Sequence, residues 1–213
     1  MSNSINVLFC NANDIDLSNF KRFEKDLKNI INWKQFKSYK NEINQKEYLI
    51  SSLLIANILN KFKIPANQLV RKQNKKPFIK NNKIYFSISH SNGLVILAYD
   101  NKPVGCDIET IVESDFNNIS KNIFSVEENL LVNKQKKSFD VFYKIWCCKE
   151  SLIKILDSGI SKIKKTSIQF KKEWETSYLN NKYYFCTKKI KKNMLAVCSV
   201  KKNLDIKISK IKF

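Results

Sequence analysis

Two carboxylates stand one residue apart in the stretch PVGCDIE, and a third follows later in the chain. Alternate side chains of a β-strand share a face, so Asp107 and Glu109 are expected to point to the same side. Mg²⁺ prefers a few carboxylates together with water and phosphate oxygens. Asp107, Glu109 and Glu150 are therefore candidate ligands of a Mg²⁺ site, and the alternative is that these carboxylates are only structural.

A lysine lies in the middle of an apolar helix face. Six apolar residues recur at helical spacing over residues 139–156, namely Phe142, Ile145, Trp146, Leu152, Ile153 and Leu156. Lys149 takes the central position of that stripe. Such departures from a local pattern tend to mark functional sites, and the alternative explanation is a snorkelling lysine or an ordinary ion pair. Lys154 follows Glu150 by four residues, the spacing of a helix-stabilising pair.

The elements that must hold these residues can be read from periodicity. Apolar residues predict a helix over 45–62, and two β-rich segments around HSNG predict a hairpin over residues 83–100. PVGCDIE reads as the next strand, and FSVEENLLV as a helix start with a capping box between Ser125 and Glu128. The segment after Gly159 is β-rich, so the fold class is α+β, and no linker separates independent domains.

Composition excludes several classes of protein. The 213 residues contain three glycines, too few and too scattered for a dinucleotide fingerprint or a Walker loop. Six cysteines without a C-x-x-C pair, together with one histidine, argue against zinc and for reduced core thiols. No apolar run reaches the length of a membrane span, and the N-terminus does not resemble a signal peptide, so we expect a cytoplasmic protein with no membrane association.

The net charge of +20 is unevenly distributed. Residues 48–99 hold 8 basic and no acidic side chains, whereas residues 100–150 hold 7 basic and 9 acidic ones. This contrast favours a site that binds a polyanion beside a divalent cation. A lysine-rich nucleic-acid-binding protein is the alternative, although only two of the basic residues are arginine, which base-reading proteins use most.

Five ordered elements together resemble one family. KKPFI, FSISHSNGLVILAYD, PVGCDIE, FSVEE and WCCKESLIK follow one another between Lys75 and Gly159. In this order they resemble the surfactin-type 4'-phosphopantetheinyl transferases. The resemblance implies two similar α/β halves around a pseudo-twofold axis, with coenzyme A at their junction. Residues 1–102 would form the first half, with helices, hairpin and phosphate contacts, and residues 103–213 the second, with the metal site, the catalytic helix and a β-rich tail.

The same resemblance implies roles for individual residues. Asp107, Glu109 and Glu150 would hold Mg²⁺ against the pyrophosphate of coenzyme A. The expected coenzyme A contacts are Lys76, Ser89, His90, Lys149 and Lys154. The expected catalytic residues are Glu128, Glu150 and Lys154, with Glu128 as general base or further metal ligand, or only a helix cap. Where the family usually places an arginine for the 3'-phosphate, this chain has Ser52, and Lys37 or Lys40 are possible substitutes.

The implied activity is Mg²⁺-dependent transfer of 4'-phosphopantetheine from coenzyme A to a serine of an apo acyl or peptidyl carrier protein, with release of adenosine 3',5'-bisphosphate. The implied partners are coenzyme A and an acidic carrier, without nucleic acid, and the expected state is a monomer with a pseudo-dimeric fold. A non-catalytic coenzyme A-binding relative is a further alternative. The sequence leaves the physiological carrier open.

Overall fold

A computed structural model describes residues 4–71, 76–80, 84–134, 138–157, 166–170, 174–178 and 180–213. Its helices are α1 Glu24–Leu27, α2 Trp33–Ser38, α3 Glu42–Lys61, α4 Asn117–Ile123, α5 Val126–Asn133 and α6 Ser138–Leu156. Its strands are β1 Ser4–Asn11, β2 Leu69–Val70, β3 Phe78–Ile79, β4 Tyr85–Ser91, β5 Leu94–Asp100, β6 Val104–Thr110, β7 Gln169–Phe170, β8 Trp174–Tyr178, β9 Asn181–Ile190, β10 Asn193–Ser199 and β11 Asp205–Lys210.

Two sheets of the described chain carry the fold. The first sheet has the strand order β11-β1-β5-β4, and the second has the order β6-β10-β9-β8-β7. β1 runs parallel to β11 and antiparallel to β5, while β10 is antiparallel to both β6 and β9. The strand β11 near the C-terminus therefore joins the sheet that the N-terminal strand β1 begins.

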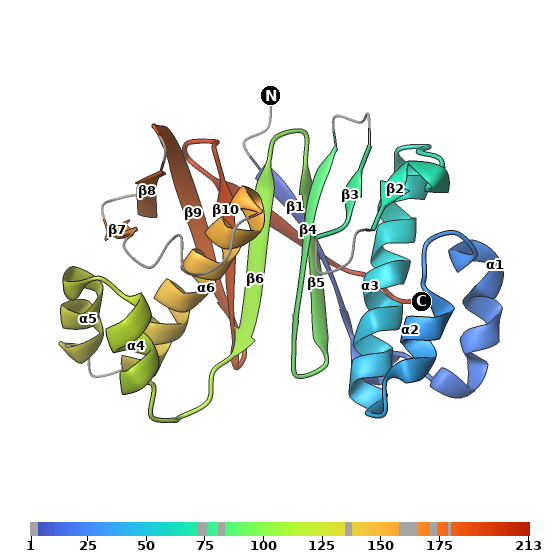
Figure 1. Ribbon diagram of the computed structural model, residues 1–213, viewed down its shortest axis with the longest axis horizontal. Helices are drawn as coiled ribbons and strands as arrows, with labels where there is room; N and C mark the ends of the chain where they lie inside the picture. Colours follow the sequence, from blue (N-terminus) through green and yellow to red (C-terminus); the bar gives the residue numbers. More distant parts are fainter. Residues whose placement is uncertain are drawn as a thin grey trace.

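Most strands lie between two groups of helices, with α1–α3 on one flank and α4–α6 on the other (Figure 1). The two sheets pack against each other through residues such as Val7 and Ile96 of the first and Ile108 and Leu195 of the second. α3 covers the other face of the first sheet, and α6 covers β6 and β10 of the second. Burial of apolar side chains at three successive interfaces thus holds the layers together.

The hairpin β4–β5 closes through a two-residue turn. Asn92 and Gly93 both have positive φ, 47° and 81°, the backbone that a type I′ turn requires. Gly93 tolerates this conformation because it has no Cβ. The predicted hairpin is confirmed, and so are the predicted helices at α3 and α6 and the predicted strand at β6. The predicted role of Gly159 as the end of α6 lies outside the described residues.

Helix α6 lies unusually close to strand β6. A Cβ atom added to Gly105 would overlap the carbonyl group of Ser151. The absence of a side chain at Gly105 therefore allows the helix backbone to approach the strand. This contact fixes the distance between the strand that carries Asp107 and Glu109 and the helix that carries Glu150 and Lys154.

The two sheets meet where β4 lies beside β6, and serine side chains join them. Three serines alternate along one face of β4, which we call the serine row: Ser87, Ser89 and Ser91. The backbone N–H of Cys106 donates to Ser87 Oγ at 3.1 Å, and the N–H of Thr110 donates to Ser91 Oγ at 3.1 Å. The serine row thus substitutes for part of a backbone hydrogen-bond ladder along this junction.

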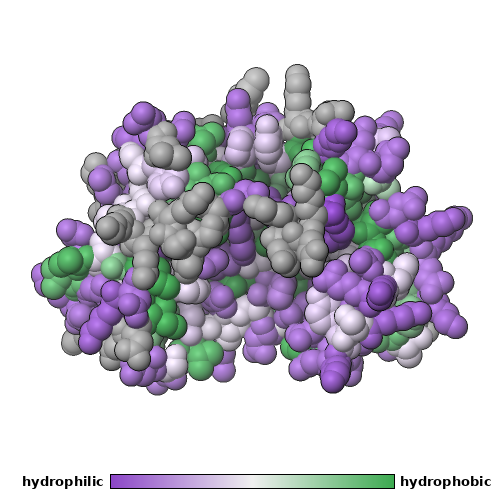
Figure 2. Space-filling model, viewed as in Figure 1, coloured by the Kyte–Doolittle hydropathy of each residue, from purple (hydrophilic) through white to green (hydrophobic). Residues whose placement is uncertain are grey.

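The predicted α+β class is confirmed. The pseudo-twofold relation and the division at residue 102 stay predictions. No helix in the described part of the chain combines the length and apolarity needed to cross a membrane. The face shown in Figure 2 is largely hydrophilic, with smaller hydrophobic areas between the polar side chains.

Candidate functional site

Asp107 lies at the junction of the two sheets, close to α6, with its side chain nearly fully buried. Its Oδ1 accepts hydrogen bonds from Ser89 Oγ and from Lys154 Nζ, both at 2.7 Å. Its Oδ2 is buried and has no hydrogen-bond partner. A buried carboxylate oxygen left without a donor is costly, and a bound cation or ligand donor is one way to satisfy it.

Two further carboxyl groups are electrostatic neighbours of Asp107. Burial raises the pKa of Glu109, and the charge of Asp107 raises it further. Burial and the charge of Asp107 likewise raise the pKa of Glu150. Ser91 Oγ donates to Glu109 Oε2 at 2.9 Å and so positions that carboxyl group. The site thus contains more negative charge than its own lysine neutralises.

These three residues are the predicted Mg²⁺ ligands. In the described ranges no group of three or more His, Cys, Asp or Glu side chains already has the geometry of a metal site. The donor set nevertheless fits a hard cation, because it consists of carboxylate oxygens and includes the orphaned Oδ2 of Asp107. Their assignment as metal ligands stays a prediction.

Two lysines, Lys154 and Lys76, lie near Asp107 at the C-terminal end of α6. Burial lowers the pKa of Lys154, but the charge of Asp107 and smaller contributions from other neighbouring groups together raise it on balance. Lys76 Nζ donates to the carbonyl oxygens of Val104 at 3.3 Å and Lys154 at 3.0 Å. Lys76 therefore binds the C-terminal end of α6, where helix carbonyls lack intrahelical partners, and burial lowers its pKa.

Ser89 and His90 are adjacent in β4 and hence face opposite sides of the sheet. Ser89 faces Asp107, whereas His90 faces α3, where its Nδ1 lies 2.9 Å from Glu47 Oε2. The other oxygen of Glu47 accepts the N–H of Gly93 at 2.8 Å. Glu47 thus fixes both the hairpin turn and the imidazole, whose side chain is 55% exposed and accessible to a ligand.

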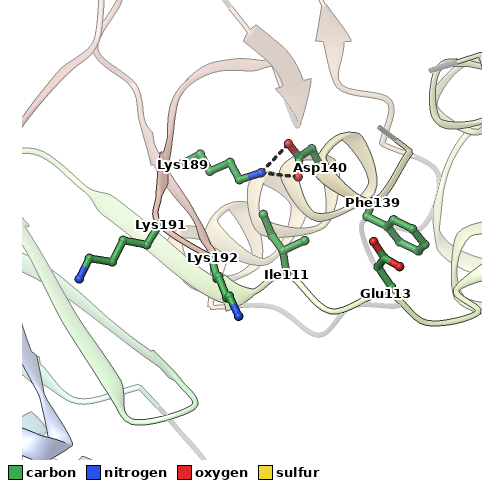
Figure 3. A pocket seen from close by; sticks show the side chains of 7 residues that line it. All are labelled: Ile111, Glu113, Phe139, Asp140, Lys189, Lys191 and Lys192. Carbon is green, nitrogen blue, oxygen red and sulfur yellow. Dashed lines mark hydrogen bonds and ion pairs between the residues drawn. The ribbon is translucent and has the colours of Figure 1, made fainter. Parts of the chain in front are cut away.

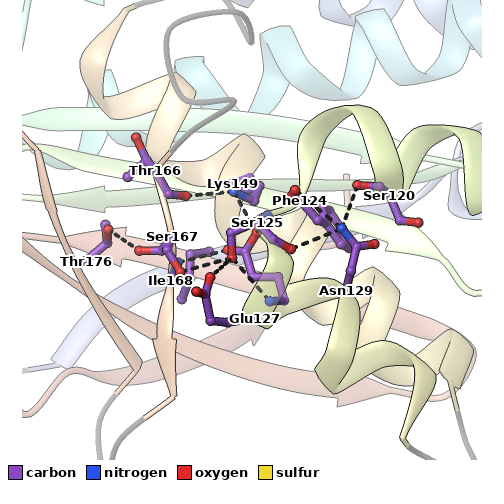
Figure 4. Close-up of polar contacts among 11 residues, drawn as sticks. Ser120, Phe124, Ser125, Glu127, Asn129, Lys149, Thr166, Ser167, Ile168 and Thr176 are labelled. Atoms are coloured by element: carbon purple, nitrogen blue, oxygen red, sulfur yellow. Dashed lines mark hydrogen bonds and ion pairs between the residues drawn. The ribbon is translucent and has the colours of Figure 1, made fainter.

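Lys149 and Glu128 form an ion pair inside the protein, and Figure 4 shows Lys149 with its partner Thr166. Lys149 Nζ lies 3.0 Å from Glu128 Oε2 and donates to the carbonyl of Thr166 at 2.7 Å, and the two side chains are 1% and 0% exposed. Glu128 also accepts the N–H groups of Ser125 and Ile168. The pair links α5, α6 and the segment before β7. The predicted coenzyme A contact of Lys149 and the predicted general-base role of Glu128 stay predictions.

Sequence reasoning missed two residues that contact the candidate site, Ser91 and Glu47. It named a third, Ser52, only as the residue at the position of an expected arginine. Ser91 was detectable from the alternation of serines in FSISHS, and Glu47 from its place in the apolar part of a helix. Ser52, which stands where an arginine was expected, is buried in α3 and donates to the carbonyl of Tyr48 at 3.0 Å. Its hydroxyl is thereby engaged inside the helix.

Comparison with known proteins identifies relatives of this site. Residues 103–202 match the family model of the 4'-phosphopantetheinyl transferase superfamily. The chain is 33% identical to the 4'-phosphopantetheinyl transferase gsp of Aneurinibacillus migulanus over 130 residues, which cover 59% of this chain and 54% of that protein. It is 32% identical to the transferase psf-1 of Bacillus pumilus over 125 residues, 56% of this chain and 53% of that protein.

A third relative is the 4'-phosphopantetheinyl transferase Sfp of Bacillus subtilis (strain 168). The identity is 40% over 79 residues, which cover 36% of this chain and 35% of that protein. The chain therefore spans about half the length, or less, of these curated relatives.

Proposed function

Because residues 103–202 match the family model of the 4'-phosphopantetheinyl transferase superfamily, we propose that the chain belongs to it and transfers the 4'-phosphopantetheine group of coenzyme A to a serine of an apo carrier protein. In this reaction the serine oxygen bonds to the β-phosphorus of coenzyme A and the pyrophosphate bond breaks. Adenosine 3',5'-bisphosphate is the leaving group, and the serine proton passes to a carboxylate.

The observation that carries this proposal is the environment of Asp107. A buried carboxylate with an unsatisfied oxygen lies beside Lys154, close to two carboxyl groups of raised pKa. Asp107, Glu109 and Glu150 would hold Mg²⁺, which would neutralise phosphate oxygens of coenzyme A. Lys154 would add positive charge on the same phosphates, and positioning of this kind is most of what phosphoryl transfer needs.

The remaining predicted contacts divide between the two sides of β4. Ser89 would meet the phosphates near Asp107, and the exposed imidazole of His90 would meet the 3'-phosphate on the α3 side. Glu128, the predicted general base, is fully buried against Lys149, so it would hold α5 and α6 together rather than accept the serine proton.

The test is transfer of radiolabelled phosphopantetheine from coenzyme A to apo carriers of fatty-acid, polyketide and peptide synthesis, with and without Mg²⁺. We expect Asp107→Ala and Glu150→Ala to lower the rate by about a hundredfold or more. Asp26→Ala, which removes an exposed carboxylate of α1, is the matched control and should leave the rate unchanged.

Two outcomes would contradict the proposal. Wild-type protein that binds coenzyme A but transfers nothing to any carrier would be a non-catalytic relative. Protein that fails with every carrier and binds DNA with a steep salt dependence would be a nucleic-acid-binding protein, whose lysines contact phosphates.

A further inference from the structure

A pocket of about 450 Å³ lies outside the site described above, between the start of α6 and the turn that joins β9 to β10 (Figure 3). Ile111 and Phe139 supply apolar surface to its lining, and Lys191 and Lys192 supply positive charge. Both lysines are exposed at the turn, where Lys191 has a φ of 54°. The pocket therefore combines an apolar lining with a basic edge.

The pocket is close in the fold to the candidate reaction centre. Ile111 follows Glu109 by two residues, and its N–H donates to the carbonyl of Lys192 at 2.7 Å, which prolongs the pairing of β6 with β10. Two residues of extended chain span about 7 Å and return to the same face of the strand. Ile111 thus lies on the face that presents Asp107 and Glu109.

Helix α6 runs from the pocket to the same centre. Phe139 lies in its first turn and Glu150 farther along, a separation of about 16 Å at the helical rise of about 1.5 Å per residue. Trp146 lies between them along the helix. A loop of a partner protein bound in the pocket would therefore reach the carboxylates of the candidate site.

The charges around the pocket favour an acidic partner. Lys189 is already neutralised by Asp140, whose two oxygens lie 2.8 and 2.7 Å from its Nζ. Lys191 and Lys192 point away from Asp140 and carry charge that this carboxylate does not neutralise (Figure 3). Glu113 is the acidic residue that opposes them, and it too is exposed.

We propose that this pocket docks the carrier protein, an inference that rests on the proposed transfer. An apolar side chain of the carrier enters between Ile111 and Phe139, and carboxylates beside it pair with Lys191 and Lys192. Charges at the rim of an interface mainly steer association, so they act on the apparent affinity for the carrier rather than on the chemical step.

The first test reverses the charge of the turn. Lys191→Glu/Lys192→Glu should raise the KM for an apo peptidyl carrier domain and for an apo acyl carrier protein by about tenfold, with kcat and coenzyme A binding unchanged. The difference from wild type should shrink as ionic strength rises. Lys207→Glu/Lys212→Glu makes the same charge change at exposed lysines on and beyond β11 and is the matched control.

The second test should improve binding, which a folding defect cannot imitate. Glu113→Lys removes the opposing charge, so it should lower the KM for the same carriers at low salt. An unchanged KM for the carriers in Glu113→Lys would overturn the docking site. An equal rise in this KM in Lys191→Glu/Lys192→Glu and in the control Lys207→Glu/Lys212→Glu would overturn it as well.

Direct binding of the apo carriers without coenzyme A separates this inference from the proposed function. If wild-type protein binds the carriers through the turn lysines but transfers nothing to them, the docking site stands and the proposed activity is wrong. If neither Lys191→Glu/Lys192→Glu nor Glu113→Lys changes the transfer reaction, the proposed activity stands and the docking site is wrong. Loss of oligonucleotide binding rather than carrier binding in the turn variant would also overturn it.

Discussion

Asp107 shows what a single residue contributes at this site. Its carboxylate is buried, bonded on one oxygen to Ser89 and Lys154, and unsatisfied on the other. The sequence predicted that Asp107 and Glu109 share a face of a strand. It could not show that a lysine four residues after Glu150 would turn to Asp107, because that contact joins residues 47 apart in the chain.

The ion pair of Lys154 and Asp107 yields a prediction on metal binding. Lys154→Met leaves a buried carboxylate without its cation, which should lower the free energy of unfolding by up to about 3 kcal/mol. Mg²⁺ should restore part of this loss, because both oxygens of Asp107 then become available to it.

Thermal unfolding with and without MgCl₂ measures the effect. The rise in Tm on adding Mg²⁺ should be larger for Lys154→Met than for wild type, whereas the exposed-lysine control Lys207→Met should behave as wild type. Equal shifts in all three proteins would mean that Asp107 does not bind the metal.

At the scale of elements, α6 is the helix that brings the chemistry together. It places Lys154 against Asp107 at one end and Phe139 at the open pocket at the other. Its apolar stripe was readable from the sequence, and Lys149 was correctly found inside it. The partner of Lys149 could not be found from the sequence, since Glu128 comes from a different helix and the pair forms only when α5 packs on α6.

Close packing of α6 on β6 predicts the effect of Gly105→Ala. The new Cβ would overlap the carbonyl of Ser151, so the helix would have to move away from the strand. We expect a loss of about 1–3 kcal/mol in unfolding free energy, from overpacking, together with a fall in transfer rate.

Urea unfolding and the carrier assay measure both quantities for Gly105→Ala. Ala98→Gly, a change of similar size in the buried strand β5, should lower stability without displacing α6 and is the control for the transfer rate. Full activity in Gly105→Ala would show that the spacing of strand and helix is not critical.

The buried pair of Lys149 and Glu128 predicts a stability role separate from catalysis. Burial lowers the pKa of Lys149, and the charge of Glu128 opposes that effect. Lys149→Met leaves Glu128 charged and buried, which should cost about 3–5 kcal/mol. Chemical denaturation measures this cost, and Lys121→Met, at an exposed lysine of α4, should be neutral.

At the scale of the whole molecule, the two sheets bury most of the thiols. The six described cysteines are free, and only Cys186 is partly exposed. Burial raises the pKa of Cys10 to about 11, with a smaller contribution from Asp14, and burial raises the pKa of Cys106 and Cys147 as well. The expectation of reduced, packed cysteines is consistent with this arrangement.

Thiol burial predicts a loss of stability at alkaline pH. A thiol whose folded pKa is raised stabilises the fold fully below its unfolded pKa of 9.0, and that stability is lost as pH rises through about 11. The free energy of unfolding should therefore fall across this window, and less steeply in Cys10→Ala.

Urea titrations at a series of alkaline pH values measure the slope. In native protein near neutral pH, a thiol reagent should modify Cys186 first, and the five buried thiols only on unfolding. Rapid modification of all six cysteines in native protein, or an identical slope in Cys10→Ala, would contradict this account.

Local sequence patterns were enough to predict the α+β class, the hairpin, the shared face of Asp107 and Glu109, and the apolar stripe around Lys149. These features follow from periodicity, which short-range backbone geometry imposes. The side-chain partners depend instead on tertiary contacts: Ser89 and Lys154 for Asp107, Glu47 for His90, and Glu128 for Lys149. Each pair joins elements distant in sequence, and only the packing of two sheets between two groups of helices brings such residues into contact.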